Sequence, residues 1–314
     1  MHRIDKAEMT LRNSLAIRRS DLVLVLCDEG TLDIAQIFFQ AASRLSSYPV
    51  LLEMPVMRYH GDEPSDMVAR CMLKSDVVLA PTTYSITYTQ ATRRAISKGA
   101  RVATMPGITM DMLEGGGLDA DYEGIARSIR KFGRKFGKAR EIHITSKEGT
   151  DLSVSVERRI WITEDNGLCT AKGALTNLPA GKVFIAPRES TANGRIVFDG
   201  AFIGPPVEKV EMTLKDGLAT NIQGPEPLRE LFKRSRCGRT LCEIGVGMNP
   251  SARVIGNVLE DQKALGTVHI GFGDNYTFGG SIRCDMHNDG MVLRPTLTVD
   301  GTTVISDGAF KLDL

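Results

Sequence analysis

The first 140 residues alternate between short apolar runs and longer segments with an amphipathic pattern. Strands that are apolar on both faces and separated by helices are typical of parallel βαβ units. The pattern therefore predicts a parallel sheet flanked by helices. The apolar runs are Leu22 to Cys27, Val50 to Met54, Val77 to Ala80 and Arg101 to Met105, and the amphipathic segments lie at about 32–46, 64–74, 86–98 and 120–138.

From about residue 141 the pattern changes to a period of two, broken by turn residues. The stretch EIHITSKEGTDLSVSVERRIWITEDNG at 141–167 alternates polar and apolar residues, which predicts antiparallel hairpins. We expect helical interruptions only at 226–234 and 252–265. The predicted fold is α/β, with an N-terminal α/β domain with a parallel sheet at 1–140 and a C-terminal antiparallel β-rich α+β domain at 141–314.

Two features of the N-terminal half bear on ligands. The candidate strands end in loop residues such as Asp28-Glu29-Gly30, and in an open parallel sheet such loops form the usual ligand crevice. The glycine run at 115–117 lacks the strand-turn-helix context of a dinucleotide-binding motif, so we expect no such cofactor.

The basic segment at 127–140 is typical of a solvated helix end followed by a linker, with an acidic-ligand or subunit contact as the alternative.

Composition adds constraints on partners and compartment. With 314 residues, 42% hydrophobic residues and a net charge of +1, the chain has no global field that favours nucleic acid. Its apolar runs are too short to cross a bilayer, and the charged N-terminus lacks an apolar signal segment. Six cysteines without a C-x-x-C pair fit neither a zinc ribbon nor a disulfide framework. We expect a cytoplasmic protein with reduced thiols and no nucleic-acid or membrane partner.

Candidate chemistry gathers in the C-terminal half. His287-x-Asp289 places an imidazole and a carboxylate on the same face of a strand, where both can reach one cation, although such pairs also arise by chance. His269 and Glu243 lie in apolar, glycine-containing stretches. A lone histidine there is more often a core residue, but a buried carboxylate needs a partner or a cation. Together the four side chains offer donors suited to zinc, iron, manganese or cobalt.

Several segments carry a resemblance to a known family. Asn177-LPAGKVFIAP, Leu241-CEIGVGMNP, Gly256-NVLEDQKALGTVHIGFGDNY and the His-x-Asp pair resemble the metal-dependent aminopeptidases typified by aminopeptidase T, often labelled leucyl aminopeptidase. The resemblance covers most of the chain. It implies that Glu243, His269, His287 and Asp289 are metal ligands and that Tyr276 is a catalytic hydrogen-bond donor. It also implies a homodimer.

One position departs from the aminopeptidase pattern. Lys182 stands where those enzymes have another glutamate that binds the second metal. An ammonium beside Glu243 repels a second divalent ion and takes roughly its place, which predicts one metal rather than two and a charge-stabilising role for Lys182. The alternative is that Lys182 points to solvent and Glu189 substitutes as a ligand.

The same segments are also similar to 2,5-dihydroxypyridine 5,6-dioxygenase, a ring-cleaving non-haem iron enzyme. That enzyme keeps the His-x-Asp pair and has histidine in place of Glu243, so it uses two histidines and one carboxylate on one metal. In this chain Glu243 and His269 match the aminopeptidase pattern, whereas the loss of a glutamate at Lys182 resembles the one-metal dioxygenase.

The resemblances leave three functional hypotheses. The first is an enzyme, a metallo-aminopeptidase-like hydrolase that uses one divalent zinc, cobalt, manganese or iron ion to cleave a small amide or short peptide-like substrate. The second is a mononuclear non-haem iron ring-cleaving dioxygenase of the 2,5-dihydroxypyridine dioxygenase type. The third is a non-catalytic relative in which the site has decayed.

Overall fold

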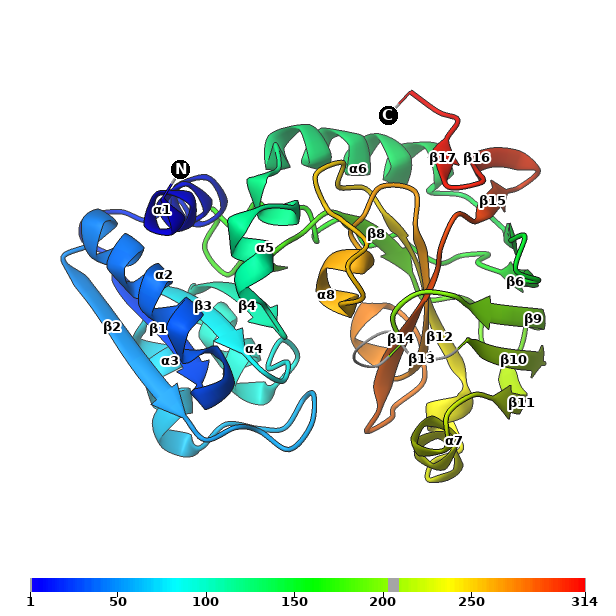
Figure 1. The fold of residues 1–314 in the computed structure, drawn as a ribbon, viewed down its shortest axis with the longest axis horizontal. Coiled ribbons are helices and arrows are strands. Elements are labelled where there is room, and N and C mark those ends of the chain that lie inside the picture. The colour runs from blue at the N-terminus through cyan, green and yellow to red at the C-terminus, as the bar shows by residue number, and fades with distance from the viewer. Residues whose placement is uncertain (1, 203–208, 314) are drawn as a thin grey trace. The chain divides into compact units, whose positions relative to one another are not determined.

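The chain folds into two compact units, and a computed structural model describes residues 2–202 and 209–313 (Figure 1). Unit 1 comprises the described residues up to Ala126 together with Glu164–Ala180. Unit 2 comprises Arg127–Thr163 and the described residues from Gly181 onward. The division of the chain into domains at 1–140 and 141–314 stays a prediction.

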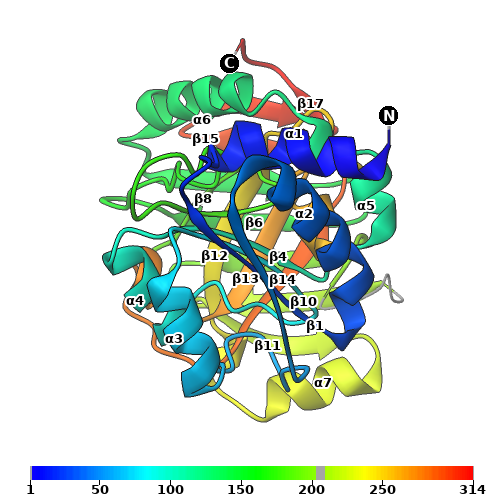
Figure 2. The same cartoon turned by 90° about the vertical axis from the view of Figure 1, so that its left-hand side faces the viewer.

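Unit 1 contains a parallel sheet of five strands in the order β2-β1-β3-β4-β7. Figure 2 shows β1 and β4 of this sheet together with the helices of unit 1. The sequence predicts the first four of these strands, and the structure confirms them. The fifth, β7, belongs to the segment that returns to unit 1, and the sequence pattern missed it. The strands are β1 (Leu22–Asp28), β2 (Tyr48–Met54), β3 (Val77–Thr82), β4 (Arg101–Pro106) and β7 (Leu175–Asn177).

The helices of unit 1 follow from amphipathic patterns and capping residues. Ser65 and Thr89 accept backbone N–H bonds at the starts of α3 and α4, which is the usual role of these residue types at a helix N-terminus. Leu24 and Leu26 of β1 pack in one apolar cluster with Met72 of α3. The helices and helical turns are α1 (Arg3–Leu15), η1 (Glu29–Thr31), α2 (Leu32–Leu45), α3 (Asp66–Lys74), α4 (Gln90–Ser97), α5 (Met110–Glu114) and η2 (Gly117–Asp119).

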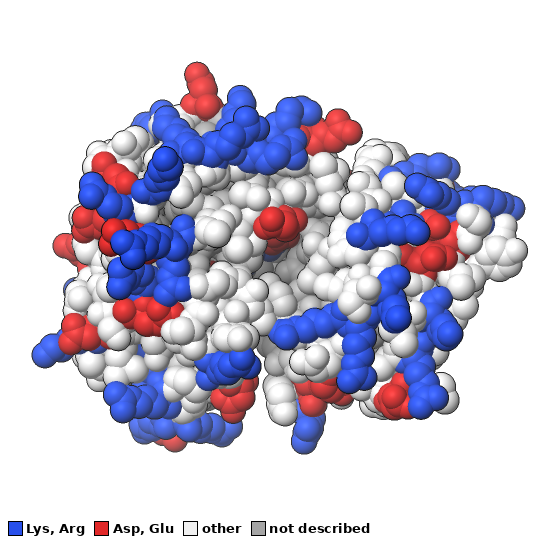
Figure 3. All heavy atoms as spheres, turned by 180° about the vertical axis from the view of Figure 1, so that it is seen from behind, with Lys and Arg blue, Asp and Glu red and all other residues white. Residues whose placement is uncertain are grey.

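The basic segment forms the second part of α6 (Tyr122–Phe136), a helix with one apolar and one charged side. Phe132 and Phe136 are buried, whereas the Lys and Arg side chains between them point to solvent. A row of basic side chains follows this helix in Figure 3. The basic side chains of this helix end are solvated, as predicted. The alternative of an acidic-ligand or subunit contact stays a prediction.

Unit 2 is built from two antiparallel sheets, as the period-two pattern predicts. One sheet has eight strands in the order β11-β10-β9-β6-β5-β15-β16-β17, and the other has four in the order β14-β13-β12-β8. The first contains β5 (Glu141–Thr145), β6 (Asp151–Ser155), β9 (Asn193–Phe198), β10 (Val210–Lys215), β11 (Leu218–Gln223), β15 (Thr296–Val299), β16 (Thr302–Ser306) and β17 (Ala309–Phe310). The second contains β8 (Lys182–Ile185), β12 (Leu241–Gly247), β13 (Val268–Gly273) and β14 (His287–Val292).

Aromatic side chains join the two sheets of unit 2. The Phe198 ring lies 4.7 Å from Phe202 and 6.3 Å from Phe272 of β13, in edge-on geometries that suit aromatic rings. Phe232 of α7 (Glu226–Lys233) packs against Phe272 as well, with ring centroids 5.7 Å apart. One face of the four-stranded sheet is thereby buried in apolar core.

The two helical interruptions have different outcomes. The helix predicted at 226–234 is confirmed as α7. Of the helix predicted at 252–265, only the short α8 (Val258–Asp261) forms. The Asp261 carboxylate accepts backbone N–H bonds from Ile255 and Gly256, which fixes the preceding residues as a loop instead of a helical turn.

The expectation of six reduced thiols is wrong for one pair. Cys237 of η3 (Cys237–Arg239) forms a disulfide with Cys284, 47 residues later in the sequence. Their spacing gives no hint of the pairing, because only the antiparallel sheet brings the two loops together. Cys27, Cys71, Cys169 and Cys242 are free.

Within the described residues, no helix is both long and apolar enough to span a membrane.

Candidate metal centre

The face of the four-stranded sheet opposite the aromatic core places two acidic residues in one row. In the strand register Glu243 of β12 is opposite Gly271 of β13, and Gly271 is opposite Asp289 of β14. A Cβ on Gly271 would lie 2.7 Å from Asp289 Oδ1 and 2.9 Å from Glu243 Cβ. The glycine in the middle strand therefore leaves the space that both carboxylates need.

His269 lies one row further along the same face, opposite Gly245. Its ring is fully buried, and Nε2 is 2.9 Å from Glu243 Oε1. A Cβ on Gly245 would come within 1.9 Å of the ring, so a glycine is required there too. His269 Nδ1 is buried and has no hydrogen-bond partner among the described residues.

His287 begins β14 and points Nε2 at both carboxylates. This nitrogen is 3.3 Å from Glu243 Oε2 and 3.4 Å from Asp289 Oδ1. The other ring nitrogen, Nδ1, is 2.8 Å from the backbone carbonyl of Asp274 and donates to it. A backbone acceptor on Nδ1 leaves the lone pair of Nε2 for a cation, which is the usual arrangement of a metal-binding histidine.

Lys182 reaches the same cluster from β8 and is only 7% exposed. Its ammonium is 3.0 Å from Glu243 Oε1, 3.0 Å from Gln262 Oε1 and 3.3 Å from His269 Nε2. It also lies 4.6 Å from the centroid of the Phe184 ring. The alternative in which Lys182 points to solvent is therefore wrong.

Glu189, the substitute ligand of that alternative, has other partners. Its carboxylate pairs with Arg159 and accepts the backbone N–H of Ser281 at 2.8 Å. It helps to hold the loop before β14 and provides no ligand beside Glu243.

Three of the side chains fit a single metal ion. Glu243, His287 and Asp289 each present one donor atom, and these atoms all lie within 4.8 Å of one another. The buried Oδ1 of Asp289 accepts no well-formed hydrogen bond within the described chain, and the donor beside it is His287 Nε2 at 3.4 Å, the atom that a metal ion would share with it. Carboxylate and imidazole donors of this kind suit zinc, manganese, cobalt and ferrous iron.

The protonation states agree with a cation site. Burial opposes ionisation of Glu243, but the Lys182 ammonium and a hydrogen bond from His269 outweigh it and hold the pKa of this carboxyl well below its usual range. Burial and Lys182 lower the pKa of His269, which is therefore neutral at pH 7.

His287 behaves in the opposite way. Burial opposes its charged form, yet the neighbouring Cys242 and Asp289 raise its pKa well above the usual value. Burial raises the pKa of the Cys242 thiol to about 11, so this thiol is neutral at pH 7 and Asp289 is the charge that matters. Without a metal, a proton on His287 thus lies between two carboxylates, where a metal ion would replace it.

Lys182 changes what the site can hold. A metal ion bound by Glu243 Oε1 and His269 Nε2 would need to lie about 2 Å from each atom. The Lys182 ammonium is already in contact with both, at 3.0 Å and 3.3 Å. It supplies a fixed positive charge on this side of Glu243, while Oε2 faces His287.

Tyr276 does not join this cluster. It lies in η4 (Tyr276–Phe278), its side chain is 50% exposed, and the Arg283 guanidinium lies over its ring. Within the described chain it makes no hydrogen bond or ion pair with the four ligand candidates. Its catalytic role stays a prediction.

Sequence reasoning missed three residues that support the site. Gln262 follows α8 and accepts a hydrogen bond from Lys182, and Asp274 orients His287 through its backbone carbonyl. Cys242 contributes a thiol 3.7 Å from His287 Nδ1. Gln262 lies within the stretch that carries the family resemblance, but only the folded chain reveals its contact.

A separate shallow hollow of about 280 Å³ lies between α6 and the Trp161 segment. Arg130 and Arg134 line it, and none of the candidate ligands does. The candidate ligands of unit 2 thus lie on the four-stranded sheet and not at this hollow.

Two solved structures share the fold of this chain. The structure is similar to 2,5-dihydroxypyridine dioxygenase from Pseudomonas putida KT2440, with a TM-score of 0.82, 18% identity and coverage of 99% of this chain and 97% of that chain. It is also similar to wild-type AmpT from Thermus thermophilus, with a TM-score of 0.73, 17% identity and coverage of 99% of both chains. These likenesses confirm the predicted fold class and no more, because both identities are low.

Sequence comparison identifies the family. No curated protein sequence matches the chain significantly. Residues 6–312 match the profile of the 2,5-dihydroxypyridine 5,6-dioxygenase family. This match spans almost the whole chain, and we conclude that the protein belongs to the 2,5-dihydroxypyridine 5,6-dioxygenase family.

Proposed function

We propose that the protein is a mononuclear metal-dependent oxygenase that opens the ring of a small hydroxylated aromatic compound. The observation that carries the proposal is the Lys182 ammonium, 3.0 Å from Glu243 Oε1, on the side where a two-metal peptidase needs its second ion. Family membership supports the choice of ring-cleaving chemistry over other one-metal reactions.

The charges of the site support one ion. Glu243 and Asp289 contribute two negative charges, and Lys182 contributes one positive charge, which leaves one net negative charge. Two neutral histidines and one carboxylate, the ligand set of many non-haem iron oxygenases, have the same net charge. A second divalent ion would leave a large uncompensated positive charge in a buried site.

Under this proposal Glu243, His287 and Asp289 would hold a ferrous ion through one donor atom each. When bound, the ion supplies the redox chemistry with oxygen. Lys182 keeps Glu243 ionised and favours an anionic substrate such as a deprotonated hydroxypyridine. Phe184 and Phe278, whose rings are 5.4 Å apart beside Lys182 and His287, offer an apolar wall for an aromatic ring.

Oxygen uptake tests the proposal. The purified protein is loaded anaerobically with ferrous iron and then mixed with oxygen and a panel of hydroxylated pyridines and catechols. We expect oxygen consumption with at least one ring compound, together with loss of its ultraviolet absorbance. The matched control is the Asp289→Asn variant, which keeps the shape of the side chain but loses a negative donor. If no compound in the panel supports oxygen uptake, the proposal is wrong.

A one-metal hydrolase is the second candidate, because Glu243 and His269 follow the aminopeptidase pattern and lie 2.9 Å apart. Under this hypothesis Glu243, His287 and Asp289 would hold an ion that would supply Lewis-acid chemistry toward a water molecule and an amide carbonyl, and Tyr276 would donate a hydrogen bond to the developing oxyanion. Cleavage of aminoacyl amides or short peptides by the zinc-, cobalt- or manganese-loaded protein would favour it over the oxygenase. A protein that binds no metal at all would instead be a non-catalytic relative.

We also propose a cytoplasmic homodimer that acts on a small molecule. The support is the family resemblance and the absence, among the described residues, of a helix that could span a membrane. Light scattering coupled to size-exclusion chromatography tests the dimer, and fractionation of the source cells tests the location.

A further inference from the structure

The disulfide of unit 2 joins the two loops that lead into the ligand-bearing strands. Cys237 lies in η3, and its carbonyl accepts the N–H of Thr240, directly before β12 and Glu243. Cys284 lies in the loop before β14, three residues ahead of His287. Strand β13 separates these two strands, so the disulfide connects them across their neighbour.

Two hydrogen bonds link Cys284 to the imidazole of His287. The backbone N–H of Cys284 donates to Asp274 Oδ1 at 3.2 Å, and His287 Nδ1 donates to the carbonyl of Asp274 at 2.8 Å. The backbone N–H of Asp274 also donates a hydrogen bond to the carbonyl of Met286 at 2.8 Å. A shift of Cys284 therefore moves the group that orients a metal ligand.

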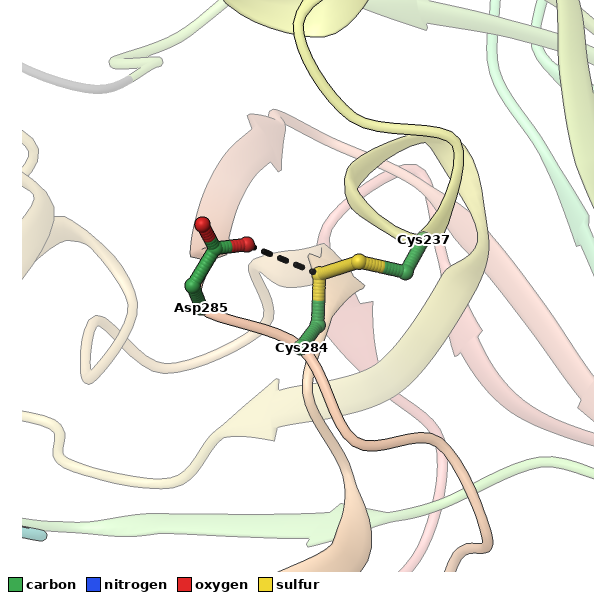
Figure 4. Close-up of side chains that lie close together, drawn as sticks. All are labelled: Cys237, Cys284 and Asp285. Carbon is green, nitrogen blue, oxygen red and sulfur yellow. Dashed lines mark hydrogen bonds between the residues drawn. A yellow bond between two sulfur atoms is a disulfide. The ribbon is translucent and has the colours of Figure 1, made fainter.

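The disulfide is reachable from solvent. Both cysteines are partly exposed, and Asp285 is exposed. Figure 4 shows the disulfide with the Asp285 side chain beside Cys284. The hydroxyl of Ser235 is 2.8 Å from Cys237 Sγ, where it can donate to a sulfur that gains negative charge. The Asp285 carboxylate lies 3.7 Å from Cys284 Sγ and disfavours a thiolate there. Cys237 is thus the better leaving group of the pair.

We propose that Cys237 and Cys284 are positioning residues that couple the metal affinity of the site to thiol redox state. This inference rests on the metal site of the proposed function. In the disulfide state the bond holds Asp274, and through it His287, in the geometry that binds metal. In the dithiol state the loop before β14 is released and metal binds more weakly.

The redox step balances with a dithiol reductant. One reductant thiolate attacks Cys284 Sγ, the S–S bond breaks, and Cys237 leaves as a thiolate that takes a proton. The second reductant thiol then closes a disulfide within the reductant and releases Cys284 as a thiol. Two electrons and two protons pass from the reductant to the protein.

Manganese titration tests the proposal, because Mn²⁺ prefers oxygen and imidazole donors over thiols. Protein oxidised in air and protein reduced with dithiothreitol are both desalted under argon and titrated with Mn²⁺ by electron paramagnetic resonance. We expect about a 10- to 100-fold weaker Kd in the reduced protein, the range for loss of a group that orients a ligand. Reoxidation should restore the affinity.

Two variants and a thiol count complete the design. The double variant Cys237→Ser, Cys284→Ser should bind Mn²⁺ weakly whatever the reductant, with a thermal transition that shows it is folded. Cys71→Ser, which removes a free thiol of α3, should respond to reduction as the wild type does. Oxidised protein, once unfolded, should titrate four thiols, those of Cys27, Cys71, Cys169 and Cys242.

The outcomes separate this inference from the proposed function. If six thiols titrate in oxidised protein, or if both redox states bind Mn²⁺ equally well, the coupling is disproved and the metal site stands. If neither state binds Mn²⁺, the metal site itself is disproved, and the coupling with it.

Discussion

Each unit gathers polar side chains on a sheet, but the two groups differ in how they are satisfied. In unit 1 Asp28 accepts from the N–H of Thr83 at 2.7 Å and from its hydroxyl at 2.8 Å, at the carboxyl ends of β1 and β3. Thr104 bonds both Thr87 and Asn177 at 2.7 Å. In unit 2 the buried Asp289 Oδ1 accepts no well-formed hydrogen bond within the described chain, and charged groups crowd around it.

The difference separates structure from function. A buried polar network whose members satisfy one another stabilises the fold and needs no ligand. A buried carboxylate oxygen without a donor costs free energy unless something else arrives to pair with it. The carboxyl ends of the parallel strands are the usual ligand crevice, yet in this chain the group of side chains that could hold a cation lies on the antiparallel sheet.

Removal of His287 gives the largest expected effect. His287→Ala deletes a donor that faces both carboxylates, so metal affinity should fall by more than about 100-fold, above the range for loss of an orienting neighbour. Isothermal titration with Zn²⁺ measures it. His143→Ala is the matched control, because His143 is a partly exposed histidine of β5 and pairs only with Asp151 among the described residues. Equal affinities in the two variants would contradict the site.

Reversal of charge at Lys182 should change the number of metal ions. Lys182→Glu replaces the ammonium beside Glu243 and His269 with a carboxylate, so the protein should bind two divalent ions per chain instead of one. Elemental analysis after dialysis against Zn²⁺ counts them. Lys182→Gln, which removes the charge without adding a donor, should still bind one. A Glu variant that also stays at one ion would show that Lys182 does not limit the site.

A methyl group at Gly271 should weaken the site by a smaller factor. Gly271→Ala places a Cβ 2.7 Å from Asp289 Oδ1, so the two acidic residues must separate. We expect about tenfold weaker Zn²⁺ binding and about 1–3 kcal/mol lower free energy of unfolding. At Gly115 a Cβ meets no atom within 4 Å, so Gly115→Ala is the control and should leave both quantities unchanged.

The polar network of unit 1 should affect stability alone. Asp28→Ala leaves the N–H of Thr83 without its acceptor and should lower the free energy of unfolding by about 1–3 kcal/mol. Zn²⁺ affinity should not change. Urea denaturation and calorimetry measure the two quantities, with exposed Glu29→Ala as the control for both. A loss of Zn²⁺ affinity in Asp28→Ala would contradict the view that the polar network of unit 1 is purely structural.

The sequence predicts four strands of unit 1 from apolar runs such as Leu22–Asp28, and it predicts the hairpin of β5 and β6 from its period of two. The rest of the predicted hairpin stretch, 156–167, forms no named strand. The sequence pattern misses β7, whose three residues Leu175–Asn177 are too few to show a period and whose partner β4 is about 70 residues earlier. Motif resemblance selected the residues that the structure brings together, including Lys182. The contacts of Gln262 and Asp274 depend on loop conformation, which no local pattern encodes.

The tethered ammonium of Lys182 has a consequence when metal is scarce. A bridging ion can be lost to a chelator or to a competing protein, but a side chain cannot. With Lys182 as a permanent counter-ion, the buried Glu243 carboxylate stays paired in the metal-starved protein. We therefore expect this sheet to keep its fold when metal is removed and added back.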